Sequence, residues 1–152
     1  MKITLAWHEA AMGSDVGRMR HLASIKAGLQ DAHGLKTAGW SEHIEGACGE
    51  MAAAKALGIY WDGSINSFSR DDLPGLQVRT RSQDHYDLIV RPSDSDDSTF
   101  LLVTGRCPHY TVHGWIKAAD AKRPEYEQAH GGRTPAYFVP RDALHSLDTL
   151  RR

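Results

Sequence analysis

The spacing of apolar residues changes at Gly58, and this change limits the possible folds more than any other feature of the chain. Before Gly58, apolar residues recur about every 3.6 positions, as they do along one face of a helix. After Gly58 they alternate with polar residues, which is typical of strands with one buried face. Helices followed by short strands predict an α/β fold of the α+β kind, in which N-terminal helices precede a central mixed β-sheet flanked by helices.

Three helices are expected in the first part of the chain. A short helix over residues 4–12 stops at Gly13, and a second helix, capped by Ser14, continues to Gly34. The third helix, over residues 41–57, is predicted most clearly. It begins at a serine that can cap it and ends before a glycine that can adopt a left-handed conformation.

Six strands are expected in the rest of the chain. Their ranges are 64–68, 76–82, 86–91, 100–105, 110–117 and 136–139. The second and third strands should form a hairpin. Residues 122–135, which contain two prolines and a Gly-Gly pair, should form a long surface loop. The chain is expected to form one domain over residues 1–152, with a helical extension over 1–40 and a core over 41–152.

Composition and charge narrow the classes of function. The chain has 152 residues, of which 41% are hydrophobic, and a net charge of −1. No global basic field therefore attracts nucleic acid, and any such contact must be local. No apolar run approaches the ~18 residues that a membrane span needs, and the N-terminus lacks the apolar stretch of a secretory signal. With only two cysteines, Cys48 and Cys107, the chain is expected to be cytoplasmic, with no membrane partner.

Glu50 lies in an apolar stripe of the predicted helix over residues 41–57. Its neighbours three, four and seven positions away on the helix are Gly46, Ala47, Ala53, Ala54 and Leu57. A carboxylate pressed into such a surface is costly unless a cation receives it. Two interpretations are open: a partly buried acid that is paired with an arginine, and a charge held at a functional site.

The strand over residues 76–82 has one apolar and one polar face. Every second residue points to the polar side, namely Gln77, Arg79 and Arg81. This polar face either contacts solvent or turns towards Glu50. In the second case Gln77 and Arg79 satisfy the acid, and Asp72, just before the strand, reaches the same place.

These residues resemble the catalytic motif of the PD-(D/E)XK, or restriction-endonuclease-like, nucleases. In that family a helix bears a glutamate, an aspartate precedes a strand, and the strand carries a (D/E)-x-K tripeptide. The segment "GACGEMAAAKAL" is similar to the helix, with Glu50 as its acid, and "DLPGLQVRT" is similar to the strand. Asp72 takes the place of the metal-binding aspartate, Gln77 that of the second acid and Arg79 that of the lysine.

The resemblance implies a restriction-endonuclease-like core and a nuclease that hydrolyses the phosphodiester bonds of DNA. Its catalytic residues would be Glu50, Asp72, Gln77 and Arg79. A Mg²⁺ or Mn²⁺ ion would be held by Asp72, Glu50 and Gln77. Residues 41–152 are also similar to uncharacterised phage and prophage proteins, which implies a phage-encoded protein in the cytoplasm of a bacterial host.

Two departures from the family pattern leave an alternative open. Gln77 offers a neutral oxygen at a position where a carboxylate would bind the metal with charge. Arg79 stays protonated, so it can orient a phosphate but cannot act as a general base. The alternative is a catalytically inactive protein of the same fold that binds nucleic acid or a protein partner.

Basic residues in the strand half of the chain would follow the phosphate backbone of DNA if several gather on one edge of the sheet, and are otherwise scattered solvated charges. They are Arg70, Arg79, Arg81, Arg91, Lys117, Lys122, Arg123 and Arg133. The nucleic-acid-binding residues selected from them are Arg81, Arg91, Arg70 and Lys117. A homodimer would also be consistent with cleavage of both strands.

Two other groups of potential metal ligands do not match known patterns. The spacing of Cys107, His109 and His113 fits no structural zinc site. The acidic residues within 94–97 lack the glycine and the terminal glutamate of a calcium-binding loop. These acidic residues are expected to form a turn instead.

Overall fold

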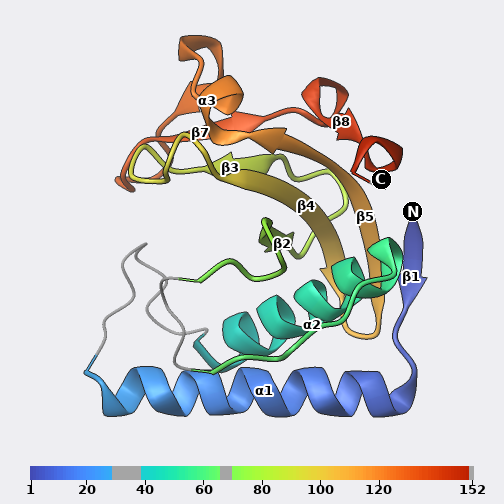
Figure 1. The fold of residues 1–152 in the computed structure, drawn as a ribbon. Helices are drawn as coiled ribbons and strands as arrows, with labels where there is room; N and C mark the ends of the chain where they lie inside the picture. Colours follow the sequence, from blue (N-terminus) through green and yellow to red (C-terminus); the bar gives the residue numbers. More distant parts are fainter. Residues whose placement is uncertain (29–38, 66–69, 151–152) are drawn as a thin grey trace.

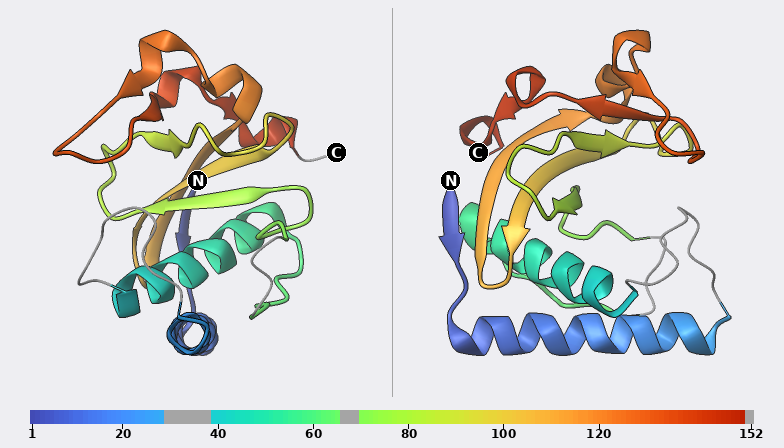
Figure 2. Two further views of the ribbon diagram at one scale, coloured as in Figure 1. Left: turned by 90° about the vertical axis from the view of Figure 1, so that its left-hand side faces the viewer. Right: turned by 180° about the vertical axis from the view of Figure 1, so that it is seen from behind.

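The structure is a computed structural model that describes residues 1–28, 39–65 and 70–150. Two helices, α1 (Trp7–Lys26) and α2 (Gly39–Leu57), lie on one side of a curved five-stranded sheet, and a three-stranded sheet lies on the other side (Figure 1). Seen along α1, helix α2 lies between α1 and the sheet (Figure 2). The predicted α+β class is confirmed.

The five-stranded sheet has the order β1-β5-β4-β2, with β8 paired to β5. Its strands are β1 (Lys2–Thr4), β2 (Gln77–Arg81), β4 (Thr99–Arg106), β5 (His109–Lys117) and β8 (His145–Ser146). β2 runs parallel to β4, and the other neighbours are antiparallel. The smaller sheet has the antiparallel order β3-β7-β6. It is formed by β3 (Leu88–Val90), β6 (Glu127–Gln128) and β7 (Ala136–Val139).

Two hydrophobic clusters lie on the two faces of β4, because successive side chains of a strand point to opposite sides. Leu101 and Val103 belong to the cluster that α2 covers. Phe100 and Leu102 belong to the cluster that the smaller sheet covers, together with the short helix α3 (Ala118–Ala121). The buried face of α2 is built mainly from alanine and glycine, so this helix can approach the sheet closely.

α1 is one continuous helix, so the predicted break at Gly13 is wrong. Gly13 and Gly17 are buried where α1 meets α2, and a Cβ atom at either position would press on α2. These glycines therefore do not end a helix. They allow α1 and α2 to approach each other closely. The predicted helix end at Gly34 lies outside the described residues. Gly58 follows α2 with a φ of 68°, the left-handed conformation expected of a terminator.

The strands predicted over 76–82, 100–105, 110–117 and 136–139 are confirmed as β2, β4, β5 and β7. β3 is a shorter form of the strand predicted over 86–91, and residues 66–68 of the strand predicted over 64–68 lie outside the described residues. The predicted hairpin of β2 and β3 is wrong, because β2 pairs with β4 whereas β3 pairs with β7 in the other sheet. The loop predicted over 122–135 contains β6.

The N-terminal segment is packed into the rest of the fold. β1 is an edge strand that pairs with β5, and α1 lies along α2. Lys55 of α2 adds a polar link, because its Nζ donates hydrogen bonds to the Thr4 carbonyl at 3.0 Å and to Glu9 at 2.7 Å. Residues 1–28 therefore form part of the same packed unit as the predicted core over 41–152.

Candidate functional site

The carboxylate of Glu50 is buried and fully engaged. Arg20 of α1 binds it through two contacts, with Nη1 at 2.7 Å from Oε1 and Nη2 at 3.0 Å from Oε2. Trp61 donates a third hydrogen bond, from Nε1 to Oε2 at 3.0 Å. Glu50 is only 6% exposed, so these donors replace water around the charge. The interpretation of Glu50 as a buried acid paired with an arginine is confirmed.

Asp72 lies close enough to Glu50 for the two charges to interact. Its Oδ2 accepts a hydrogen bond from the backbone N–H of Val78 at 2.7 Å, which closes the turn before β2. Burial raises the pKa of Asp72 above its ordinary value, although the Val78 hydrogen bond and the nearby Arg79 oppose the rise. Burial likewise raises the pKa of Glu50, and the charge of Asp72 adds to this rise against the hydrogen bonds from Arg20.

Gln77 and Arg79 point away from Glu50. Gln77 donates from Nε2 to Asp71 at 2.8 Å. Arg79 pairs with Asp94 at 3.2 Å, and its guanidinium lies 4.6 Å from the centre of the Phe100 ring, in the cluster under the smaller sheet.

The expectation that Gln77 and Arg79 satisfy Glu50 is therefore wrong. The alternation along β2 is present, but its apolar face meets α2: Val78 belongs to the cluster that α2 covers, and Thr80 packs on Gly49. A helix built from alanine and glycine buries more apolar surface against that face than against the polar one.

Two of the three side chains selected as metal ligands, Glu50 and Gln77, are already engaged by other groups of the chain. Both oxygens of Glu50 already accept hydrogen bonds, and the Arg20 guanidinium occupies the space that a cation bound to this carboxylate would need. The amide of Gln77 is directed to Asp71. Across residues 1–28, 39–65 and 70–150, no group of three or more His, Cys, Asp or Glu side chains is arranged to hold a metal ion.

The four basic residues selected for nucleic-acid binding line three different cavities. Arg70 lies 3.5 Å from Asp62 and borders a cavity of about 610 Å³ that also contains Asp71 and Asp72. Lys117 borders a cavity of about 900 Å³. Arg81 and Arg91 share a third cavity, of about 400 Å³. The structure therefore brings together only two of the four.

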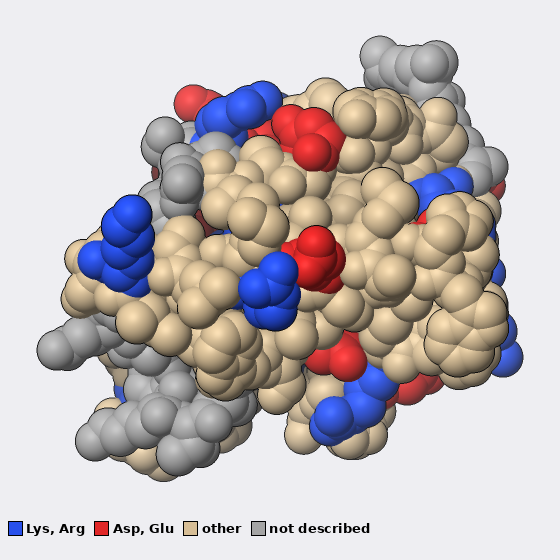
Figure 3. All heavy atoms as spheres, turned by 90° about the horizontal axis from the view of Figure 1, so that it is seen from below, with Lys and Arg blue, Asp and Glu red and all other residues tan. Residues whose placement is uncertain are grey.

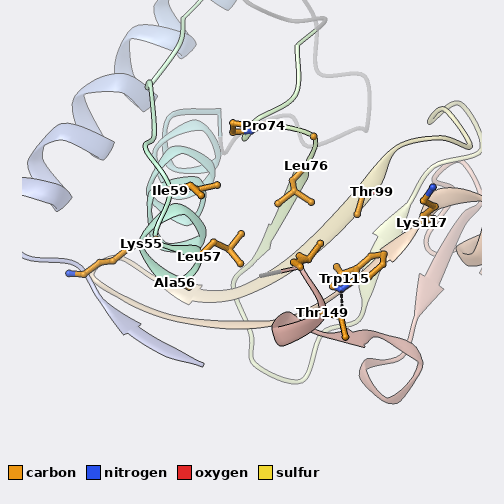
Figure 4. A pocket seen from close by; sticks show the side chains of 13 residues that line it. Lys55, Ala56, Leu57, Ile59, Pro74, Leu76, Thr99, Trp115, Lys117 and Thr149 are labelled. Carbon is orange, nitrogen blue, oxygen red and sulfur yellow. Dashed lines mark hydrogen bonds between the residues drawn. The ribbon is translucent and has the colours of Figure 1, made fainter. Parts of the chain in front are cut away.

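The cavity of about 900 Å³ is lined mainly by apolar side chains (Figure 4). Leu57 and Ile59 border it at the C-terminal end of α2, and Leu76 and Trp115 come from the sheet side. Trp115 is held in place by a hydrogen bond from Nε1 to Thr149 at 2.8 Å. Lys117 lies at the edge of the cavity, so this site offers no convergent group of charges.

The third cavity, here called the arginine cavity, gathers basic and aromatic side chains from distant parts of the chain. Its arginines are Arg81 at the end of β2, Arg91 after β3 and Arg133 in the loop between β6 and β7. The other residues that line it are His85, Tyr86, Asp87, Ile89, Gln128, His130, Thr134 and Phe138. Ile89 and Phe138 are paired between β3 and β7, so the smaller sheet supplies the apolar part of the cavity.

Arg81 is held rigidly inside the arginine cavity. Its Nη1 donates to the carbonyl oxygen of Asp87 at 2.9 Å, and its guanidinium lies 4.4 Å from the centre of the Tyr86 ring. Burial lowers the pKa of Arg81, and the positive charges of Arg91 and Arg133 lower it further, against the opposing effects of Tyr86 and Asp87. Positive charges that repel one another in a half-buried space favour the binding of an anion.

Comparisons with models of known families, with curated proteins and with solved structures find no match to this chain. Among the helices formed by the described residues, none is both long and apolar enough to cross a membrane.

Replacing Asp72 with asparagine is expected to stabilise the protein relative to wild type as the pH rises from about 4 towards neutrality. The folded-state pKa of Asp72 lies above the ordinary 3.8, so the protonated carboxyl group of Asp72 favours the folded state over the unfolded one. This contribution to stability is fully present below pH 3.8 and is lost as the pH rises through the folded-state pKa. Asparagine retains an oxygen that can accept the Val78 hydrogen bond and never ionises.

Urea unfolding of wild type and of Asp72→Asn at a series of pH values measures this difference in stability. Asp97→Asn, at an exposed position in the turn between β3 and β4, is the control. A difference between wild type and Asp72→Asn that stays constant with pH would contradict the assignment.

Proposed function

We propose that this chain binds single-stranded nucleic acid, and DNA in particular, through the arginine cavity. The observation that carries the proposal is the convergence of Arg81, Arg91 and Arg133 on one half-buried space that is also lined by aromatic rings. In this proposal the Glu50 region stabilises the fold and does not carry out catalysis. The overall charge of −1 is compatible with such binding, because the positive charge is concentrated locally.

The three arginines match the chemistry of a phosphate group. A guanidinium is planar, remains charged and can bind two phosphate oxygens at once. Arg81 is already oriented by Tyr86 and by the Asp87 carbonyl, so little side-chain entropy is lost when it binds an anion. Arg91 and Arg133 approach from other segments and allow one phosphate to be contacted from several sides.

The aromatic side chains favour a single strand over a duplex. Tyr86, Phe138 and His130 border the cavity, and an unpaired base can stack on rings of this kind. His130 and Phe138 already contact each other edge to face, with ring centres 5.0 Å apart. A cavity of about 400 Å³ is of a size that takes a small ligand, such as one nucleotide. The bases of a duplex stay stacked within the double helix and cannot enter such a cavity.

The second candidate function is hydrolysis of DNA at Glu50 and Asp72, as the resemblance to the PD-(D/E)XK nucleases implies. Their proximity, and the cavity beside Asp72, favour it. The engagement of Glu50 by Arg20, and the orientation of Gln77 and Arg79, support the binding function instead. Cleavage of DNA in Mg²⁺ or Mn²⁺ that is lost in Asp72→Asn would favour hydrolysis. Phage origin and a bacterial cytoplasm stay predictions.

Replacing Arg133 or Arg81 with alanine is expected to weaken the binding of a fluorescein-labelled oligothymidine by about tenfold. Each change removes one phosphate contact, so the dependence of log affinity on log salt concentration should also become shallower by about 0.7 per contact. Fluorescence anisotropy titrations at several salt concentrations measure both effects. Phe138→Leu should weaken binding without changing the salt dependence, because it removes a stacking surface, removes no charge and leaves the contact between Tyr86 and Arg81 in place.

Arg123→Ala is the matched control for these titrations. Arg123 is exposed, lies 3.7 Å from Glu125 and does not border the arginine cavity, so the same charge is removed at another place. Its affinity for the oligothymidine should remain within about twofold of wild type. Absence of binding by wild type at low salt, or an equal loss of affinity in Arg123→Ala and Arg133→Ala, would contradict the proposal.

A further inference from the structure

The outward face of α1 is apolar over most of its length. Trp7 is 86% exposed and Ile25 is 58% exposed at the two ends of the helix, and Met12, Met19 and Leu22 lie exposed between them. The view onto this side of the molecule shows a surface with few charged groups, among which a basic and an acidic group touch near the middle (Figure 3). Exposed apolar surface of this extent on a folded chain indicates an interaction site.

The exposed residues follow a regular helical spacing. Positions 7, 11, 15, 18, 22 and 25 are separated by three or four residues and form one stripe along the helix. The ends of this stripe are apolar, and its centre is the ion pair of Asp15 and Arg18, whose atoms lie 2.9 Å apart. A stripe of this kind fits the side of another helix.

The stripe is symmetric about a point near residue 16. Trp7 and Ile25 each lie nine positions from that point. Within the stripe, Ala11 is matched with Leu22 and Asp15 with Arg18, and beside the stripe Met12 is matched with Met19. The two members of each pair are equally far from that point to within one residue. A surface with this symmetry is complementary to itself when a second copy is turned around, which is the condition for an interface with twofold symmetry.

We propose that α1 is a dimerisation surface that packs against α1 of a second copy of this chain in antiparallel orientation. In this arrangement Trp7 lies near the second copy's Ile25, and Asp15 lies near the second copy's Arg18. Four charges then alternate in sign around the twofold axis, and apolar residues cover both ends. Figure 1 shows β3 and β7 on the opposite side of the molecule from α1, so the arginine cavity stays open in the dimer.

The charges of Asp15 and Arg18 favour an antiparallel α1 of a second copy over a parallel α1 and over a membrane surface. A parallel pair of α1 helices would place Asp15 beside the second copy's Asp15 and Arg18 beside its Arg18, which is unfavourable. A helix that lies on a membrane surface usually carries lysine and arginine on its polar face, and no acid in the middle of its apolar stripe. Asp15 occupies that middle position in α1.

Charge reversal at the centre of the stripe tests the proposal. Sedimentation equilibrium of wild type should give about twice the monomer mass of 16.8 kDa. Arg18→Asp alone and Asp15→Arg alone should each weaken self-association by at least about tenfold, because like charges then meet at the axis. An equal mixture of the two variants should form a heterodimer, because one face then carries two acids and the other two arginines. Both side chains are exposed, and circular dichroism checks that each variant remains folded.

Arg123→Asp is the control, because it makes the same change of charge away from α1 and should leave the dimer intact. A wild type that is monomeric at every concentration would overturn the proposal. So would equal weakening by Arg123→Asp, or a mixture of the two α1 variants that stays monomeric. A monomeric wild type that sediments with phosphatidylserine-containing vesicles would assign the face to a membrane surface instead.

Discussion

Replacing Arg20 with alanine is expected to lower the free energy of unfolding by about 3–5 kcal/mol. The change leaves Glu50 buried without its cation, and one hydrogen bond from Trp61 does not offset the cost of burying that charge. It also removes the hydrogen bond from Arg20 Nε to the Ser64 carbonyl at 2.8 Å, which ties α1 to the segment after α2. Urea unfolding followed by far-UV circular dichroism measures the loss.

Two further variants separate the buried charge from other effects of this substitution. Arg123→Ala removes an exposed arginine whose nearest acid, Glu125, is also exposed, and should change stability by at most about 1 kcal/mol. The double variant Arg20→Met with Glu50→Leu removes both charges and should be more stable than Arg20→Met alone, because no charge is left unpaired. A loss of under about 1 kcal/mol in Arg20→Ala would mean that Glu50 is not held by this pair.

The same experiment bears on catalysis. A carboxylate that serves catalysis alone can be replaced without loss of the fold, because its interactions are made with substrate or metal. Glu50 instead connects α1, α2 and the segment around Trp61. A large loss of stability on replacement of Arg20 would therefore support a structural role for Glu50. The function would then be the proposed binding of nucleic acid in the arginine cavity.

Local patterns predicted those parts of the fold that depend on neighbours in sequence. The alternation along 76–82 predicted β2 and its two faces, and Gly58 predicted the end of α2, because these features depend on a few adjacent residues. The demand of Glu50 for a cation was also predictable, since it follows from the apolar residues around it on the helix.

The partners of these residues were not predictable, because they come from distant segments. Arg20 lies thirty positions before Glu50, and nothing local in the sequence connects the two. The alternation in β2 does not determine which of its two faces packs on α2. In the structure the apolar face, with Val78, packs on α2. Arg133 comes close to Arg81 because β7 pairs with β3. The sequence predicted that β3 would instead pair with β2 in a hairpin, so this approach was not expected.

The glycines of α1 show the same limit. Gly13 marked a predicted helix end, because glycine is a poor helix former and often follows the last turn. In the structure it lies inside a continuous helix, at a contact that the sequence of α1 alone does not contain. A glycine can occur because a helix ends there or because two helices approach each other closely. The sequence shows the same residue in both cases, and only the packing of α1 on α2 shows which reason applies.

Replacing Gly17 with alanine is expected to lower the free energy of unfolding by about 1–3 kcal/mol, whereas the same replacement at Gly46 should raise it by about 0.5–1 kcal/mol. A Cβ atom at Gly17 would lie 2.6 Å from the backbone oxygen of His43, so α1 must move away from α2 and strain the pair of Arg20 and Glu50. At Gly46 a Cβ atom meets nothing within 4 Å, and alanine only restricts the unfolded chain. Both positions are helical, so the gain in helix propensity is common to the two variants and their difference measures the packing of α1 on α2. Urea unfolding measures the two changes, and shifts of the same sign would show that the two helices are not in the close contact described here.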